Sequence, residues 1–353
     1  MIDNMKVTII GSGSTGMATA AYLISKGVAV TICDEQTEDF PAVEKQGGII
    51  ARGNAMRGTF RPDALTDNFE EAIRSADTVI VCTSTGRHPN ITDRCAAYAA
   101  AGQLFLFNPG NLGALMLRQK LERAGIRGVL CADTSGSFWA CRRTGAGEVV
   151  VAMPLNAAKP VAACPAADTP AALERLAPLF PVCSAANVFE AALNSPNVVS
   201  HVGGAILNAI PIERAGKDYV FYLHGLGEPV FTLNEGLERE RNAVMEALGL
   251  KVYKPSGNGF MRMIMDRSSH PELDCFRSLD GPSSFAHRYV SEDAACGVSL
   301  LIALAQLVGI SVPLTTATAV IAGCLNSTDY IANGYSPAYF GLEGTAEEIL
   351  AAI

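Results

Sequence analysis

The stretch from Lys6 to Asp34 constrains the fold of this chain more than any other part of the sequence. It opens with a β-branched run, Val7 to Ile10, which has the length and composition of a buried parallel strand. A glycine-rich turn, Gly11 to Gly16, leads into a helix-forming stretch for which Gly27 is the predicted C-cap. A second apolar run, Val28 to Cys33, ends at the closing acid. This order of strand, turn, helix, strand and acid predicts the first part of a doubly wound α/β domain.

Each part of this stretch has a physical role in holding a dinucleotide. Gly11 permits a tight turn, Gly13 lets the backbone approach a pyrophosphate, and Gly16 lets the helix pack closely on the strand. The free N–H groups and the dipole at the start of the helix favour phosphate. Asp34 can accept hydrogen bonds from the ribose hydroxyls of adenosine, and its charge disfavours a 2′-phosphate. We therefore predict NAD(H) as the cofactor, with NADP(H) the weaker ligand, held by these residues: Gly11, Ser12, Gly13, Ser14, Thr15, Gly16 and Asp34.

Composition limits the classes of function. The chain has 353 residues, enough for two domains, and its 49% hydrophobic and 18% charged residues are ordinary for a globular protein. A net charge of −8 argues against nucleic acid or an anionic membrane as a partner. The ten cysteines form no CxxC pairs, and the N-terminus shows no signal-peptide pattern. Because Cys33, Cys82, Cys131 and Cys324 fall within apolar segments, we expect buried free thiols and a cytoplasmic protein.

Strands and helices alternate through the first half of the chain. Strands are predicted at Thr78 to Cys82, Leu104 to Phe107 and Val129 to Ala132, with helices between them. Small polar residues follow the first two strands, and we predict that Thr83 and Asn108 contact the cofactor, since ligands of doubly wound sheets bind at the carboxyl ends of strands. The alternation predicts a Rossmann-type, doubly wound parallel sheet.

The character of the sequence changes near Phe189. Two more strands, Glu148 to Met153 and Pro160 to Cys164, precede this point, whereas long helical stretches with few strand signals follow it. One of them, Val298 to Ile310, is strongly apolar but too short to span a bilayer, and we expect a buried helix there. We predict a dinucleotide-binding Rossmann domain over residues 1–187 and an all-helical substrate and catalytic domain over residues 188–353.

A second candidate site lies early in the helical domain. Ser195 is the predicted N-cap of a helix with Pro196 in its first position. At 100° per residue, one narrow polar stripe of this helix carries Asn197, His201, Gly204 and Asn208, and the opposite apolar face carries Val199, Val202, Ile206 and Ile210. The stripe alone favours a capped core histidine or a solvent-facing polar side over a catalytic histidine.

Charged residues precede the apolar helix further on. Arg288 stands before Glu292 and Asp293, although acids in a first helical turn are favoured by the helix dipole whatever the function. Lys217, in a Gly-Lys-Asp turn, is best interpreted as a solvated loop lysine. We expect no metal site, because the remaining histidines lack ligand spacing: His224, His270 and His287.

Taken together, these segments resemble the octopine/nopaline, or opine, dehydrogenase family, most closely a bacterial member of the amino-acid type. The resemblance extends from the glycine turn to Val312-Pro313-Leu314. It rests on these pieces: Asn108-Pro109-Gly110, Thr134-Ser135 with Cys141-Arg142, Asn197 through His201 to Asn208-Ala209, Tyr222-Leu223, Gly281-Pro282, Arg288-Tyr289 and Glu292-Asp293. It differs after His201, where Val202-Gly203-Gly204 replaces the Pro-Leu-Pro of the bacterial relative.

The resemblance implies a function and a set of site residues. Family members use a nicotinamide cofactor to reduce the imine formed between the amine of an amino acid and a 2-oxo acid such as pyruvate, and they catalyse the reverse oxidation. It implies His201 as the catalytic acid and base, Asp293 as its carboxylate partner and Arg288 as a binder of the substrate carboxylate, with Asn197 and Asn208 as further substrate contacts.

Two other functions remain open from the sequence. A ketopantoate- or 2-hydroxy-acid-type reductase shares the two-domain plan but usually relies on a lysine. A non-catalytic NAD-binding sensor would bind the cofactor without turnover. In every case the expected partners are small molecules, with no nucleic acid and no membrane, and the chain is compatible with a homodimer.

Overall fold

The computed structural model describes residues 5–253, 257–279 and 281–353. The chain divides into two compact units, Met1–Ala191 and Ala192–Ile353. The division falls within α7 (Val188–Leu193), a short helix in the stretch where the sequence changes character.

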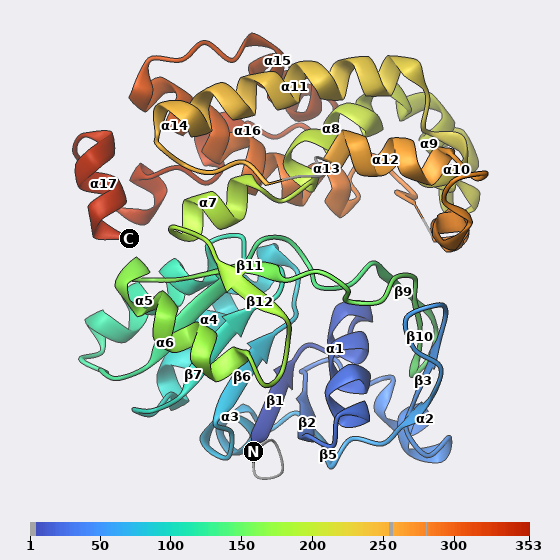
Figure 1. The fold of residues 1–353 in the computed structure, drawn as a ribbon, viewed down its shortest axis with the longest axis vertical. Helices are drawn as coiled ribbons and strands as arrows, with labels where there is room; N and C mark the ends of the chain where they lie inside the picture. Colours follow the sequence, from blue (N-terminus) through green and yellow to red (C-terminus); the bar gives the residue numbers. More distant parts are fainter. Residues whose placement is uncertain (1–4, 254–256, 280) are drawn as a thin grey trace. The chain divides into compact units, whose positions relative to one another are not determined.

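The first unit is built on an eight-stranded sheet with the order β12-β11-β8-β7-β6-β1-β2-β5 (Figure 1). Its neighbouring strands pair in parallel except β8 and β11, so the predicted Rossmann-type sheet is confirmed in its mostly parallel form. The strands are β1 (Lys6–Ile10), β2 (Ala29–Cys33), β5 (Ala64–Thr66), β6 (Thr78–Val81), β7 (Leu104–Phe107), β8 (Leu130–Thr134), β11 (Lys159–Ala163) and β12 (Val182–Ser184).

The antiparallel strand β11 has a simple cause. No helix crosses over between β8 and β11; a hairpin of β9 (Cys141–Gly145) and β10 (Glu148–Val151) connects them instead. A parallel return needs a long crossover, whereas this connection brings the chain back in the opposite direction. The hairpin joins β3 (Ile49–Arg52) and β4 (Gly58–Phe60) in a second, four-stranded sheet with the order β4-β3-β10-β9.

Apolar packing holds the first unit together. The central strands are buried on both faces, as Ile9, Ile80, Leu106 and Ala132 illustrate. The helix α1 packs against β1 and β2 and also against the second sheet (Figure 1). The helices are α1 (Ser14–Ser25), α2 (Phe40–Lys45), α3 (Phe69–Arg74), α4 (His88–Tyr98), α5 (Gly113–Arg123) and α6 (Thr169–Leu176).

The second unit is helical throughout its described part, which confirms the predicted helical C-terminal region. The longest element, α11, packs against α8, α14 and α15. The helices are α8 (Asn197–Leu207), α9 (Ala209–Ala215), α10 (Phe221–His224), α11 (Glu228–Ala247), α12 (Gly257–Met265), α13 (Arg288–Asp293), α14 (Ser299–Val308), α15 (Pro313–Asn326), α16 (Tyr330–Asn333) and α17 (Ala346–Ala352).

The apolar helix predicted at Val298 to Ile310 is part of a longer run. A π-helical segment, η6 (Ala294–Val298), joins α13 to α14, so helical structure continues from Arg288 to Val308. Among the described residues, this run is the one helix long and apolar enough to cross a membrane by length and composition. Most of it is buried inside the protein, which is the pattern of a core helix.

The cysteines differ from the prediction at one position. Cys33, Cys82 and Cys131 are buried, and burial raises the pKa of Cys82 to about 12. Cys324, in contrast, is exposed, because it lies on the outward face of α15. The apolar residues of α15 are therefore not all buried in the core.

The buried histidine at the start of α4 makes stability depend on pH. His88 is fully buried, and its ring lies edge-on to Phe107 with centroids 5.2 Å apart. Burial lowers the pKa of His88 to about 4, from an ordinary 6.5. The unfolded chain therefore binds a proton more readily than the folded one between these values, and stability should fall as pH falls through this window.

We predict that His88→Leu removes this part of the acid sensitivity. Between pH 7 and pH 4 the wild type should lose up to roughly 3 kcal/mol more unfolding free energy than the variant. Urea unfolding followed by the fluorescence of Trp139, the single tryptophan of the chain and buried in the same unit, measures this directly. Equal losses in the two proteins would show that His88 does not titrate as the structure indicates.

Candidate functional site

The three glycines of the turn between β1 and α1 differ in the space around them, and only one leaves room for a ligand. Gly11 has φ +109°, and a Cβ there would lie 2.9 Å from the carbonyl oxygen of Cys82. A Cβ on Gly16 would clash with the carbonyl oxygen of Gly11. Gly13 is exposed, and no atom lies within 4 Å of the position its Cβ would take. The first and third glycines thus serve the fold, while the second leaves room for a ligand beside the backbone.

The residues between these glycines are fixed by hydrogen bonds. Ser12 donates both its N–H and its hydroxyl to Asp34, and the Ser14 hydroxyl accepts the N–H of Arg143 in β9. The Thr15 carbonyl accepts the hydroxyl of Thr19 within α1. Because the first N–H groups of a helix have no intrahelical partner, the start of α1 beside Gly13 fits an anionic ligand such as a pyrophosphate.

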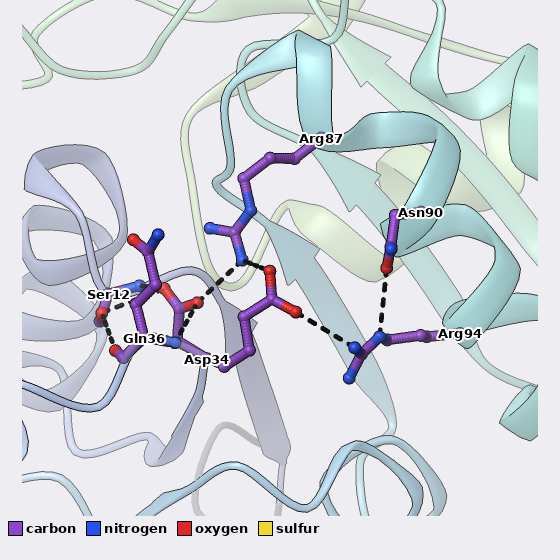
Figure 2. Close-up of polar contacts among 7 residues, drawn as sticks. Ser12, Asp34, Gln36, Arg87, Asn90 and Arg94 are labelled. Carbon is purple, nitrogen blue, oxygen red and sulfur yellow. Dashed lines mark hydrogen bonds and ion pairs between the residues drawn. The ribbon is translucent and has the colours of Figure 1, made fainter.

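Asp34, at the end of β2, is more fully occupied than the sequence predicted. It is 2% exposed, and its Oδ2 atom accepts the Ser12 N–H at 2.7 Å and the Ser12 hydroxyl at 3.0 Å. Its Oδ1 atom accepts the Gln36 N–H at 3.2 Å and the Arg87 Nη2 at 3.0 Å (Figure 2). Burial alone would raise the pKa of Asp34, but the bonds from Ser12, Arg87 and Gln36 outweigh it and hold the pKa below its usual value. Ribose hydroxyls would have to share or replace one of these donors.

Two arginines that the sequence analysis missed complete this cluster. Arg87 also contacts Glu35 at 2.8 Å, and Arg94 contacts the other oxygen of Glu35 at 3.1 Å. In the sequence, Arg87 is visible only as a basic residue shortly after β6. Its spacing does not show that it reaches Asp34, which follows β2 and lies 53 positions away.

The two residues predicted to follow strands into the cofactor site differ from each other. Thr83 is buried, and its hydroxyl has no hydrogen-bond partner among the described residues, so it remains a candidate ligand contact. Asn108 is 0% exposed; its amide donates to Thr19 and accepts the N–H of Phe138. The side chain of Asn108 is therefore engaged inside the unit, with Thr19 and Phe138, and a contact with the cofactor stays a prediction.

In the second unit, α8 presents His201 to Asp293 of α13. The Nδ1 atom of His201 lies 2.8 Å from the Oδ2 atom of Asp293, and both side chains are buried. The ring of Tyr289 stacks on the His201 ring, with centroids 3.7 Å apart and planes 10° apart, and Phe221 meets it edge-on at 6.5 Å. An aspartate at Nδ1 fixes the tautomer and the orientation of the ring, and it makes Nε2 the nitrogen that can exchange a proton with a ligand.

Small residues allow the helices to approach closely enough for this bond. A Cβ on Gly204 would lie 2.7 Å from the ring of Phe221, and one on Gly297 would lie 2.6 Å from Val198. Gly297 belongs to η6, which begins directly after Asp293. A π-helical segment changes the direction of the side chains that follow it, and such segments are frequent at functional sites.

The helix that carries His201 differs from the prediction at both ends. It begins at Asn197 rather than at Pro196, which stands just before it. It ends at Leu207, and Ile210 lies in α9 and is exposed rather than on a buried apolar face. Since α8 is buried on nearly all sides, His201 does not lie on a solvated stripe.

The three predicted substrate-binding residues are placed differently. Asn197 is half-buried, one helical turn before His201. The amide of Asn208 donates to the carbonyls of Gly204 and Gly225, at 2.8 and 3.0 Å, so its donors hold backbone together. Arg288, the first residue of α13, is exposed, and its guanidinium carbon lies 5.7 Å from the Tyr289 ring centroid.

Two other features bear on the chemistry of the site. In the described ranges, no group of three His, Cys, Asp or Glu side chains is arranged to hold a metal ion. Lys217, predicted to be a solvated loop lysine, is exposed in a short helical turn after α9.

The comparisons with known proteins decide the family. The alpha-helical domain of the NAD/NADP octopine/nopaline dehydrogenases matches residues 184–326, and the ketopantoate reductase PanE/ApbA family matches residues 7–108. The opine dehydrogenase of Arthrobacter sp. (strain 1C) is 32% identical over 363 residues and covers 100% of both chains. The chain belongs to the opine dehydrogenase family.

The chain is also similar to more distant proteins. The protein ocs of Agrobacterium tumefaciens (strain Ach5) is 22% identical, with 96% of each chain covered. An octopine dehydrogenase solved with NADH and L-arginine shares the fold of this opine dehydrogenase family member, with a TM-score of 0.74 at 18% identity, over 99% of this chain and 98% of that one.

We predict that Gly13→Ala weakens dinucleotide binding without affecting the fold. Its Cβ meets no protein atom, so the melting temperature should stay within a few degrees of wild type, while the affinity for NADH should fall at least ~10-fold because the methyl group occupies the space beside the backbone. Calorimetric titration with NADH measures the affinity. Gly227→Ala, another site with room for a methyl group, is the control. Unchanged NADH affinity in Gly13→Ala would remove this turn from the cofactor site.

Proposed function

We propose that this protein is an NAD(H)-dependent opine dehydrogenase. It joins the amine of an amino acid to a 2-oxo acid by reduction of the imine between them, and it catalyses the reverse oxidation. Membership of the family supports the proposal, as does the shared fold of octopine dehydrogenase, which has been solved with NADH and L-arginine and with NADH and pyruvate. The observation that carries it is the buried His201–Asp293 pair, at 2.8 Å, beneath the Tyr289 ring.

The residues of the first unit fit the cofactor. The open face of Gly13 and the start of α1 would hold the pyrophosphate, and Thr83 would add a hydroxyl at the end of β6. When bound, the nicotinamide ring supplies or accepts the hydride. The remaining chemistry, orientation of the substrate and movement of protons, falls to the residues of this chain.

His201 is the proton donor and acceptor in this proposal. Reduction of an imine or carbonyl carbon needs a proton at the adjacent heteroatom, and an imidazole supplies one near neutral pH. Asp293 holds the ring through Nδ1 and stabilises the imidazolium that forms when Nε2 accepts a proton in the oxidation direction. Tyr289 keeps the ring in one plane by stacking on it.

Arg288 is the proposed binder of the substrate carboxylate. Its guanidinium is exposed, and it begins the helix that ends in Asp293, so recognition and proton transfer share one short element. A planar guanidinium pairs with a carboxylate through two parallel hydrogen bonds and thereby sets the orientation of the adjacent carbon. Asn197, one turn from His201, is a second candidate contact, whereas the donors of Asn208 are already engaged.

Dependence on the amine tests the function against its rivals. Purified protein is mixed with NADH, pyruvate and single amino acids, and NADH absorbance is followed. We expect oxidation of NADH only when both substrates are present. Equal rates with the oxo acid alone would favour a hydroxy-acid-type reductase, and binding without turnover for any pair would favour a sensor.

We also propose that the protein works as a cytoplasmic homodimer formed through α15. The exposed positions of this helix are apolar and recur every three or four residues: Pro313, Leu314, Ala317, Val320, Ile321, Cys324 and Leu325. The large members are 40% to 56% exposed, and α15 contains no charged residue that would select a charged partner. Because a two-fold axis pairs identical surfaces, a second copy covers this stripe with itself. The helix is about 21 Å long, which suits the apolar centre of an interface that needs about 800 Å² per partner.

We predict that His201 and Asp293 act as one unit. His201→Ala should lower kcat by about 10²- to 10⁴-fold and leave the Kd for NADH within error. Asp293→Asn should reproduce much of the loss, and the double variant should be little worse than the worse single variant. The exposed His224→Ala is the control. Wild-type turnover in His201→Ala would return the histidine to a structural role.

We predict that Arg288→Lys separates recognition from proton transfer. The lysine keeps the charge but loses the planar fork, so the KM for the oxo acid should rise at least ~10-fold and kcat should fall through misorientation, with the Kd for NADH unchanged. Steady-state kinetics with Arg239→Lys, an exposed arginine of α11, as the control decides this. A lower melting temperature with an unchanged KM would assign Arg288 to helix stability alone.

We predict that a charge on the α15 stripe breaks the dimer. Ile321→Glu should give the mass of a single chain in light scattering at micromolar concentration, where the wild type gives twice that mass, since a buried unpaired carboxylate is costly. Met265→Glu places the same charge on an exposed apolar residue of α12 and should leave the dimer intact. A monomeric wild type, or a dimeric Ile321→Glu, would contradict the proposal.

A further inference from the structure

Arg87 lies across the end of the strand that leads into the glycine turn. It belongs to the short 3₁₀ turn η2 (Thr85–Arg87) after β6, whereas Asp34 and Glu35 follow β2. In the sheet, β6 and β2 are the two neighbours of β1. The contacts from Arg87 to these acids therefore bridge the carboxyl edge of the sheet at the point where β1 becomes the glycine turn (Figure 2).

The charges in this cluster are balanced. Asp34 and Glu35 contribute two negative charges, and Arg87 and Arg94 contribute two positive charges through contacts of 2.8 to 3.1 Å. An acid at the end of this strand normally disfavours a 2′-phosphate on adenosine by repulsion. Here the Arg87 guanidinium, which is bound to the same carboxylate, compensates this repulsion. The preference for one cofactor therefore cannot be inferred from Asp34 alone.

The two arginines differ in how available their guanidinium groups are to a ligand. Arg94 donates its Nε to Asn90, and its guanidinium lies 4.5 Å from the centre of the Phe69 ring, so it is held away from Asp34. Arg87 uses its Nη2 atom for both acids, and its side chain is 26% exposed. Arg87 is thus the cation placed to exchange a carboxylate for a phosphate, which guanidinium binds in the same geometry.

We propose that Arg87 determines how the protein discriminates between NADH and NADPH. The inference rests on the proposed use of a nicotinamide dinucleotide. With Arg87 present, the charge of Asp34 is compensated and a 2′-phosphate gains a partner. The protein therefore binds NADPH less weakly than it would if Asp34 stood alone. Without Arg87, Asp34 has a free acceptor position for ribose hydroxyls and repels a 2′-phosphate.

The test measures binding rather than turnover. Wild type and Arg87→Met, which keeps the length of the stem but removes the charge, are titrated calorimetrically with ADP-ribose and with 2′-phospho-ADP-ribose. Arg94→Met is the matched control, because it removes a charge from the same cluster without touching Asp34. Melting temperatures of the three proteins establish that they are folded.

We expect Arg87→Met to lower the affinity for the 2′-phosphorylated ligand at least ~10-fold and to leave the affinity for ADP-ribose within about 3-fold. Arg94→Met should change both affinities by less than about 3-fold. Equal changes for the two ligands in Arg87→Met, no change in either, or the same selectivity loss in Arg94→Met would overturn the role of Arg87. Failure of wild type to bind either ligand would instead overturn the proposed function, and this inference with it.

Discussion

The bond between His201 and Asp293 is the interaction on which the candidate site of the second unit depends. An imidazole and a carboxylate lie 2.8 Å apart in an interior from which water is largely excluded. Burying such groups is costly unless each finds its partner, so the surrounding structure must hold both in place. The absence of side chains at Gly204 and Gly297 permits the close helix packing, and the stacked Tyr289 ring fixes the plane of the imidazole. The His201 ring is thus held in one orientation by a carboxylate at Nδ1 and by an aromatic ring against its face.

In the first unit, the glycine turn after β1 has two structural requirements. The turn must be tight, which Gly11 and Gly16 provide, and it must leave backbone accessible, which Gly13 provides. Ser12 ties this turn to Asp34, and Arg87 ties Asp34 to the next strand. The adenosine end of the proposed cofactor site is therefore a charged network that exists before a ligand binds, and selectivity depends on which contact the ligand replaces.

Much of the fold followed from local sequence, because glycine positions and apolar periodicity are local signals. The glycine turn, the parallel strands around it and the helix carrying His201 are of this kind. The direction of β11 could not be predicted, since it depends on a hairpin in place of a crossover helix. The burial of Asn108 and the contact of Arg87 with Asp34 depend on long-range packing that one sequence does not reveal. The stacking of Tyr289 on His201 likewise joins residues 88 positions apart.

The central claim is that hydride reaches a carbon that also forms a bond to the nitrogen of the amino acid. The most direct measurement uses NADH that carries deuterium in place of the transferred hydrogen, with pyruvate and an amino acid that supports turnover, and analyses the product by mass spectrometry. We expect one deuterium in a secondary amine product, on the carbon derived from the oxo acid. Deuterium in a 2-hydroxy acid, with the amino acid recovered unchanged, would contradict it.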